Sequence, residues 1–248
     1  MSSNYFCNYN KINVYNKKSI KSDLVTQILY GEKFKIISKY GNWYKIKLHT
    51  DNYVGFIIKK KFAHTFKPTH KIINLKARIF KYPKNLVKYK SNNFLPFASK
   101  IKVLKKYKNF IMFDKNKWLH INDIKKDNYQ ERNFIKILKL FINCKYKWGG
   151  KTFNGIDCSG LLQIFFQFNN KFVPRDTKDQ IKFFNKKKNF LNKNRLIFWK
   201  GHVAICINKN SLIHAYGPKK KVLIMNIKKT INEIRQNTNL EVITKYKN

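Results

Sequence analysis

Short stretches in which hydrophobic and polar residues alternate fill the first half of the chain. The clearest of them cover residues 23–34, 40–47 and 52–57. Turn residues separate the stretches at intervals that are typical of a small β-barrel. A second and weaker series follows at residues 94–104 and 117–121. The pattern predicts either two small all-β modules, at residues 1–64 and 65–128, or one larger all-β domain.

From residue 129 onward the spacing of hydrophobic residues changes and helices are expected. Residues 133–142 mix apolar and basic side chains at helical spacing, which predicts a first helix packed on a core. Residues 158–168 form an apolar run long enough for a buried helix, and Asp157 before it is a good N-cap. Residues 129–248 are therefore expected to form a domain of mixed helix and strand.

Cys158 is the candidate nucleophile. Glycines at positions 149, 150 and 155 predict a tightly turning loop just before it. Its thiol is expected in the first turn of the helix, where unpaired N–H groups and the helix dipole favour a thiolate. A lowered thiol pKa would make Cys158 reactive near neutral pH.

Two histidines can serve this cysteine. His202 opens a predicted strand at residues 201–207, and His214 lies in the next one at residues 211–215. The short turn between these strands predicts a hairpin, which can bring the two rings side by side. One histidine can then act as base while the other holds its tautomer. A single histidine is more often structural, and this context is missing around His49, His64, His70 and His120.

The order of these motifs resembles the catalytic domain of NlpC-type cell-wall peptidases, which are papain-like cysteine peptidases. The resemblance covers residues 132–228 and rests on the strings YKWGG, DCSG, PRDT with a following glutamine, GHVAI and LIHA. It implies that Cys158 is the nucleophile, His202 the base and His214 the residue that orients the base. The family usually carries Gly-Asp before the strand that leads to the base. Asn194-Arg195 stands there instead, so a different local turn is expected.

The N-terminal strands are similar to bacterial SH3-like modules. The resemblance therefore implies an α+β protein, with a papain-like catalytic domain preceded by two small SH3-like β-barrels. It points to γ-D-glutamyl-diamino-acid endopeptidases of the dipeptidyl-peptidase VI type, in which Tyr53 would close over the substrate amine and Asp23 would bind it. The other substrate-binding positions that it implies are Tyr146, Asp157, Ser159, Arg175 and Thr177.

The expected function is therefore a cysteine endopeptidase acting on murein-derived peptides. The bond expected to be cut is the γ-D-glutamyl-diamino acid bond of free L-Ala-γ-D-Glu-diaminopimelate peptides during cell-wall recycling. Two alternatives stay open. One is an SH3-like protein that binds peptidoglycan or peptide through a catalytically altered peptidase fold, which the presence of Cys158, His202 and His214 disfavours. The other is an amidase or acyltransferase on the same fold, because it would pass through the same thioester.

The charge of the chain is unusual, with 54 basic and 12 acidic residues and a net charge of +42. Such a balance normally suggests nucleic acid or anionic membranes as partners. Nearly all the basic residues are lysines spread along the whole sequence, and they do not cluster into a binding stripe. We therefore expect a murein peptide and no specific nucleic acid as the partner.

The remaining features exclude several classes of protein. No stretch reaches the roughly 20 continuous apolar residues of a membrane span. The first residues have neither the basic start nor the apolar core of a signal peptide, so a cytoplasmic protein is expected. We also expect a monomer. The four cysteines lack metal-binding spacing and suit a reducing compartment, so neither a cofactor nor a metal is expected.

Overall fold

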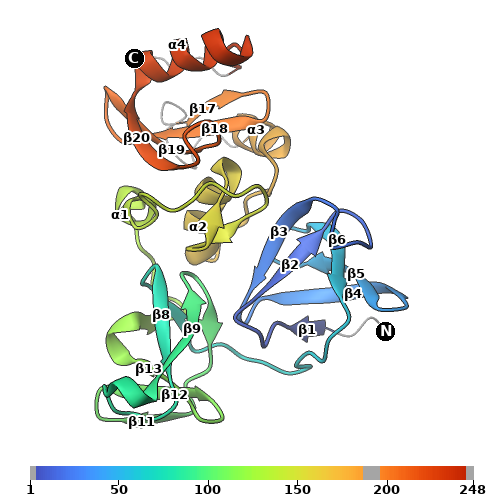
Figure 1. Ribbon diagram of the computed structural model, residues 1–248, viewed down its shortest axis with the longest axis vertical. Helices are drawn as coiled ribbons and strands as arrows, with labels where there is room; N and C mark the ends of the chain where they lie inside the picture. Colours follow the sequence, from blue (N-terminus) through green and yellow to red (C-terminus); the bar gives the residue numbers. More distant parts are fainter. Residues whose placement is uncertain (1–3, 187–195, 244–248) are drawn as a thin grey trace. The chain divides into compact units, whose positions relative to one another are not determined.

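The computed structural model describes residues 4–186 and 196–243 (Figure 1). Asn194-Arg195, where a different turn was expected, lies outside the described residues. Contacts within the chain define two compact units. The first contains residues 1–130 and 168–170, and the second contains residues 131–167 and 171–248.

The first sheet of the N-terminal unit has six strands in the order β1-β4-β5-β6-β2-β3. Alternation along β2 buries Ile12 and Val14, which pack with Ile28, Phe34 and Ile46 in one hydrophobic core. The strands are β1 (Asn4–Phe6), β2 (Lys11–Tyr15), β3 (Leu24–Leu29), β4 (Lys33–Tyr40), β5 (Trp43–Leu48) and β6 (Val54–Ile58).

The expectation of closed barrels is not met. The six-stranded sheet ends at β1 and β3, which are not paired with each other. Alternating residues determine which face of a strand is buried, but closure of a barrel also depends on strand tilt and stagger. That geometry is not encoded in the alternation, so the sequence pattern could not distinguish a barrel from an open, curved sheet.

The second series of strands forms two further sheets, in the orders β10-β7-β14 and β11-β12-β13-β8-β9. Their shared core contains Ile72, Leu95, Ile101 and Leu119, and Tyr30 from the first series joins it. Short 3₁₀ turns, η1 (Val87–Tyr89) and η2 (Ile121–Asp123), connect some of the strands. The strands are β7 (His70–Ile72), β8 (Lys76–Phe80), β9 (Lys90–Pro96), β10 (Lys100–Ile101), β11 (Lys105–Tyr107), β12 (Phe110–Asp114), β13 (Lys117–His120) and β14 (Ile124–Lys126).

The C-terminal unit is built on a four-stranded antiparallel sheet in the order β17-β18-β19-β20. Figure 1 shows α4 on one side of this sheet and α1 and α2 on the other. Its strands are β17 (Leu196–Trp199), β18 (His202–Cys206), β19 (Ser211–Tyr216) and β20 (Lys221–Asn226), and a small hairpin is formed by β15 (Lys151–Thr152) and β16 (Gly155–Ile156). The helices are α1 (Phe134–Lys139), α2 (Cys158–Phe168), α3 (Thr177–Lys186) and α4 (Ile227–Thr238).

Three sequence expectations about this unit are confirmed. The first helix lies within residues 133–142, although it is shorter than the pattern suggested. A buried helix begins at Cys158 and ends at Phe168. The predicted hairpin is present, with β18 and β19 paired antiparallel. These elements bring together the segments that carry the candidate chemistry.

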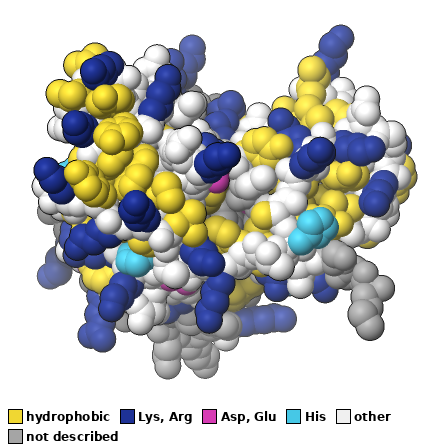
Figure 2. Space-filling view, turned by 90° about the horizontal axis from the view of Figure 1, so that it is seen from below, with side chains coloured by type: hydrophobic (Ala, Val, Ile, Leu, Met, Phe, Trp, Pro, Cys, Tyr) yellow, Lys and Arg dark blue, Asp and Glu magenta, His cyan; other side chains and the backbone are white. Residues whose placement is uncertain are grey.

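The face of the molecule drawn in Figure 2 shows no dominant stripe of basic side chains. On the face drawn in Figure 2, lysine and arginine side chains are scattered between apolar ones, and acidic side chains are scarcely visible. Within the described residues, no helix is both long and apolar enough to cross a membrane.

Candidate active site

The loop before Cys158 is fixed by the carboxylate of Asp157. Its Oδ1 accepts a hydrogen bond from the Gly160 N–H at 2.7 Å, which is the N-cap contact expected for the first turn of α2. Its Oδ2 accepts one from the Gly149 N–H, also at 2.7 Å. Gly149 has a φ of 68°, a backbone conformation that glycine adopts without strain. One side chain therefore joins the glycine loop to the start of the helix.

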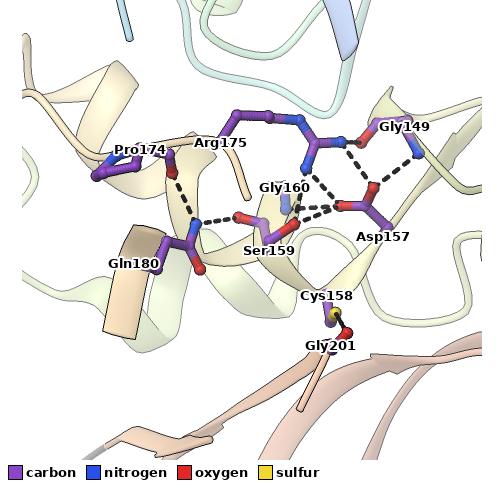
Figure 3. Close-up of polar contacts among 10 residues, drawn as sticks. Gly149, Asp157, Cys158, Ser159, Gly160, Pro174, Arg175, Gln180 and Gly201 are labelled. Atoms are coloured by element: carbon purple, nitrogen blue, oxygen red, sulfur yellow. Dashed lines mark hydrogen bonds and ion pairs between the residues drawn. The ribbon is translucent and has the colours of Figure 1, made fainter. Parts of the chain in front are cut away.

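Arg175 completes the contacts of this carboxylate (Figure 3). Its Nη1 donates to Asp157 Oδ1 at 2.9 Å and its Nη2 donates to Oδ2 at 2.7 Å. Both side chains are almost fully buried, with 1% of Arg175 and 7% of Asp157 exposed. The two-point geometry is the strong form of an arginine–carboxylate pair. Backbone N–H groups and Arg175 thus already surround the carboxylate in the free protein, and the expected role of Asp157 in binding substrate stays a prediction.

Ser159 and Gln180 extend the same network. The Ser159 hydroxyl accepts a hydrogen bond from Arg175 Nη1 at 2.8 Å and donates one to Asp157 Oδ1 at 3.3 Å. Gln180 Nε2, on α3, donates to the carbonyls of Ser159 and Pro174 at 3.0 and 2.9 Å. Ser159 is buried, so its side chain lies within the framework of the site. The segments around residues 149, 157 and 175 are thus held as one body.

The thiol of Cys158 points away from that network, toward the start of β18 (Figure 3). Its Sγ lies 4.0 Å from the carbonyl oxygen of Gly201, to which the thiol donates. Burial raises the pKa of this thiol to about 11, and the charge of Asp157 adds to the effect. The expected lowering of the thiol pKa is therefore wrong for the free protein, because loss of solvation outweighs the backbone N–H groups of Ser159 and Val203.

The two histidines expected to cooperate are in contact. His202 Nε2 lies 3.0 Å from His214 Nδ1, within hydrogen-bond distance. The Tyr216 ring is stacked on His214, with centroids 4.7 Å apart and planes 12° from parallel. Burial lowers the pKa of His202 to about 4 and that of His214 to about 3. Both rings are accordingly neutral at pH 7.

The cysteine and the histidine pair are neighbours through the backbone. Cys158 contacts the carbonyl of Gly201, the residue directly before His202. Among residues 4–186 and 196–243, no hydrogen bond joins the thiol to either imidazole. Catalytic hydrogen bonds are often long or misaligned in a free enzyme and tighten when substrate binds. The described state is therefore a resting arrangement with a protonated thiol.

Two other predicted site residues lie in the same unit. Tyr146 is half-buried, and burial raises its pKa, with further contributions from Cys158 and Asp157. Its side chain is therefore close enough to the nucleophile for their charges to interact. Thr177 is buried at the first position of α3, two residues after Arg175. A role of either residue in binding substrate stays a prediction.

Tyr53 and Asp23 lie in the N-terminal unit, whereas Cys158 lies in the C-terminal unit. Tyr53 is half-buried beside the core of the first sheet, and its N–H donates to Asp51 Oδ1 at 3.0 Å. Asp23 is exposed and accepts a hydrogen bond from Asn16 Nδ2 at 3.2 Å. Their roles toward substrate remain predictions.

Met225 is a neighbour of the site that the sequence reasoning missed. Its sulfur lies 3.3 Å from His214 Nε2. The period-two pattern of β20 could have placed its side chain on one face of the sheet, but not beside a particular histidine nitrogen. The described residues contain no group of three or more His, Cys, Asp or Glu side chains arranged to hold a metal ion.

Comparison with known proteins identifies two segments. Residues 143–240 match the NlpC/P60 family, and residues 14–61 match the bacterial dipeptidyl-peptidase SH3 domain. The second series of strands has no such match among these findings, so a second SH3 domain is not confirmed. Residues 143–240 contain Cys158, His202 and His214, the three residues at the centre of the site described above.

Two curated relatives match most of the chain. A γ-D-glutamyl-L-lysine dipeptidyl-peptidase of Bacillus cereus is 26% identical over 237 residues, covering 82% of this chain and 70% of the relative. Dipeptidyl-peptidase 6 of Lysinibacillus sphaericus is 25% identical over 228 residues, covering 82% and 84%. Both alignments are long enough to extend beyond the segment that carries the cysteine and histidines.

A solved structure supports the fold. The crystal structure of an NlpC/P60 family protein from Bacillus cereus aligns with a TM-score of 0.76 and covers 98% of this chain and 99% of its own. Sequence identity over that alignment is 19%, so the likeness concerns the fold.

Proposed function

Because the chain carries an NlpC/P60 domain, a cysteine peptidase domain, together with a bacterial dipeptidyl-peptidase SH3 domain, we propose that it cleaves free murein peptides. The bond cut is the one that joins γ-D-glutamate to the following diamino acid in peptides beginning with L-alanine. The two relatives carry names of dipeptidyl-peptidases, and one name specifies a γ-D-glutamyl-L-lysine bond. Recycling of wall fragments is the role that fits such a substrate.

One observation carries the proposal. The thiol of Cys158 lies against Gly201, the residue before His202, and His202 is within hydrogen-bond distance of His214. A nucleophile, a base and a residue that orients the base are the parts that thiol-dependent acyl transfer requires. Those three side chains come from α2, β18 and β19 within one compact unit.

The reaction would start from uncharged groups. As Cys158 Sγ bonds to the scissile carbonyl carbon, its proton passes to Nδ1 of His202, whose Nε2 faces His214. The Cys158 N–H, in the first turn of α2, is the proposed donor to the oxyanion, a type of contact typically worth about 2.7–4 kcal/mol. His202 then gives the proton to the departing amine as the C–N bond breaks. Water, deprotonated by His202, then attacks the thioester carbonyl. As the C–S bond breaks, His202 returns the proton to Cys158 Sγ and the acid is released.

The Asp157–Arg175 pair supports this chemistry without a direct step in it. It keeps α2 and the glycine loop in register through the Gly149 and Gly160 N–H groups. Tyr146, Ser159 and Thr177 are the proposed lining of the substrate site in the same unit. Tyr53 and Asp23 are the proposed partners of the substrate ammonium, an interaction that would restrict cleavage to peptides with a free amine.

A digestion experiment tests the proposal. The purified protein is incubated with L-Ala-γ-D-Glu-L-Lys and with the corresponding diaminopimelate tripeptide, and the products are identified by mass spectrometry. We expect L-Ala-γ-D-Glu and the free diamino acid from the wild type, and no products from Cys158→Ala. Cleavage between alanine and glutamate, or binding without hydrolysis, would refute the proposal. Transfer of the acyl group to an added amine in preference to water would favour an acyltransferase.

A further inference from the structure

His214 is fully buried, and both of its ring nitrogens have a neighbour. Nδ1 lies 3.0 Å from His202 Nε2, and Nε2 lies 3.3 Å from the sulfur of Met225. We propose that Met225 is a positioning residue that selects the tautomer of His214, and through it the form of His202 that can accept the thiol proton. The inference rests on the proposed function, because it assigns Met225 a task in that reaction.

The direction of the hydrogen bonds follows from the sulfur. A thioether has lone pairs but no hydrogen, so it can only accept. His214 must therefore carry its proton on Nε2 to bond with Met225, and its Nδ1 is left as an acceptor. His202 must then donate through Nε2, which leaves Nδ1 of His202 unprotonated. That nitrogen is the one available to take the proton of Cys158.

The opposite tautomer would disable the base. With a proton on Nδ1, His214 would donate to His202 Nε2, and neutral His202 would carry its own proton on Nδ1. That nitrogen would then have no free lone pair with which to accept the proton of Cys158. In that tautomer the lone pairs of His214 Nε2 and the Met225 sulfur would also face each other. The thioether of Met225 therefore favours the tautomer of His214 that carries its proton on Nε2.

The fold holds the sulfur in place. In the β19–β20 pair, His214 is opposite Leu223 and Leu212 is opposite Met225. Met225 is therefore the diagonal neighbour of His214 on the same face of the sheet, within reach of a long side chain. The Tyr216 ring is stacked on the His214 ring and restricts its plane. The contact thus has a defined direction.

Met225 also packs beside hydrophobic residues, so packing has to be separated from tautomer selection. The first measurement uses the wild type. Two-bond proton–nitrogen NMR spectra of the protein labelled with ¹⁵N-histidine distinguish protonated from bare ring nitrogens at pH 7. Signals of His202 and His214 are assigned by their loss in the single variants. We expect a proton on Nε2 of both rings, and a proton on Nδ1 of His214 would overturn the proposal directly.

The second measurement uses substitutions. Met225→Leu keeps a similar apolar volume but removes the acceptor, whereas Met225→Gln offers an amide oxygen. For the leucine variant we expect a population with the proton on His214 Nδ1, and a kcat reduced about threefold to tenfold with an unchanged KM. The glutamine variant should restore the original tautomer. Met112→Leu is the matched control, because Met112 is a half-buried methionine on β12 in the other unit.

The outcomes separate the two proposals. If Met225→Leu keeps the wild-type tautomers and its kcat equals that of Met112→Leu, Met225 is a packing residue and the inference fails. If the wild type cuts none of the murein peptides but shows the expected tautomers that shift in Met225→Leu, the inference about the histidine pair stands and the proposed substrate fails. Should the leucine variant not fold, the wild-type spectrum still decides.

Discussion

Arg175 and Asp157 form a buried ion pair in which each carboxylate oxygen receives one guanidinium nitrogen, at 2.9 and 2.7 Å. The same carboxylate caps α2 and bonds to the glycine loop, so the pair fixes the backbone on both sides of Cys158. Breaking a buried pair leaves an uncompensated charge, which is far more costly than losing a surface pair. The arrangement of the nucleophile therefore depends on a contact that does not itself react.

Arg175→Lys should lower the free energy of unfolding by about 1–3 kcal/mol, because a single ammonium cannot serve both carboxylate oxygens and leaves a buried polar group unpaired. Urea unfolding measures this difference. Arg235→Lys is the matched control, since Arg235 pairs with Glu241 on the surface, with both side chains more than half exposed. It should change stability by less than about 0.5 kcal/mol. Equal effects of the two substitutions would show that burial of the pair is unimportant.

Cys158→Ala and Cys158→Ser should abolish peptide hydrolysis while the circular dichroism spectrum stays that of the wild type. The reason is that, among the cysteines in the described part of the chain, Cys158 is the one whose sulfur contacts the carbonyl of Gly201, the residue before His202. Cys206→Ala removes another buried thiol from the same strand as His202 and should keep activity at a temperature where it is folded. Residual turnover in Cys158→Ala, or its loss in Cys206→Ala alone, would reassign the nucleophile.

His202→Ala should reduce kcat/KM more than His214→Ala. His202 is proposed to transfer the proton. His214 orients the His202 ring through the 3.0 Å contact and does not exchange a proton with the thiol. Steady-state kinetics of both variants on the same tripeptide make the comparison. A larger loss for His214→Ala would reverse the two roles.

Activity should persist to lower pH than it would with a base of ordinary histidine pKa. Burial lowers the pKa of His202 from 6.5 to about 4, and only the neutral ring can act as base. We expect kcat/KM to hold from pH 7 to about pH 5 and to fall as the pH drops through about 4. A fall centred near pH 6.5 would contradict the buried, neutral pair.

The free energy of unfolding should also depend on pH through His202 and His214. Their folded-state pKa values lie below 6.5, so the unfolded chain binds more protons in acid. The stabilisation is complete above about pH 6.5 and is lost progressively as the pH falls toward 4 and 3. Urea midpoints across this range should decline less steeply in His214→Asn than in the wild type. Parallel curves would mean that His214 does not contribute.

Tyr53→Phe should slow hydrolysis of the tripeptide with a free amine and leave the N-acetylated tripeptide unaffected. Wild-type cleavage of the free peptide should be at least about tenfold faster, because acetylation removes an ammonium and leaves its partners unpaired. Tyr44→Phe is the control, since Tyr44 is also half-buried against the core of the first sheet. Equal wild-type rates on the two peptides would exclude gating by Tyr53.

Much of the catalytic unit could be predicted because its signals are local. A capping aspartate before an apolar run predicted α2, and two apolar strands around a short turn predicted the hairpin that joins His202 and His214. The chemistry of the thiol could not be predicted in the same way. Its pKa depends on how completely the folded chain removes solvent, and a helix terminus alone suggested the opposite shift.

Contacts between residues far apart in the sequence could not be predicted from the pattern either. Arg175 was expected to line the substrate site, and nothing in the string PRDT shows that its guanidinium pairs with a carboxylate 18 residues earlier. Closure of the N-terminal sheet likewise depends on strand stagger, which alternation does not specify. The sulfur of Met225 meets His214 only through the register of two strands.

Burial of the Cys158 thiol also affects how readily oxidants react with it. Conversion of cysteine to sulfenic acid and then to irreversible products proceeds through an accessible thiolate. Cys158 is 4% exposed, and its thiol has a pKa of about 11. The resting protein therefore has almost no accessible thiolate at neutral pH. The nucleophile is thus stored in its reduced form between turnovers. We therefore expect peroxide to oxidise Cys158 slowly in the free protein.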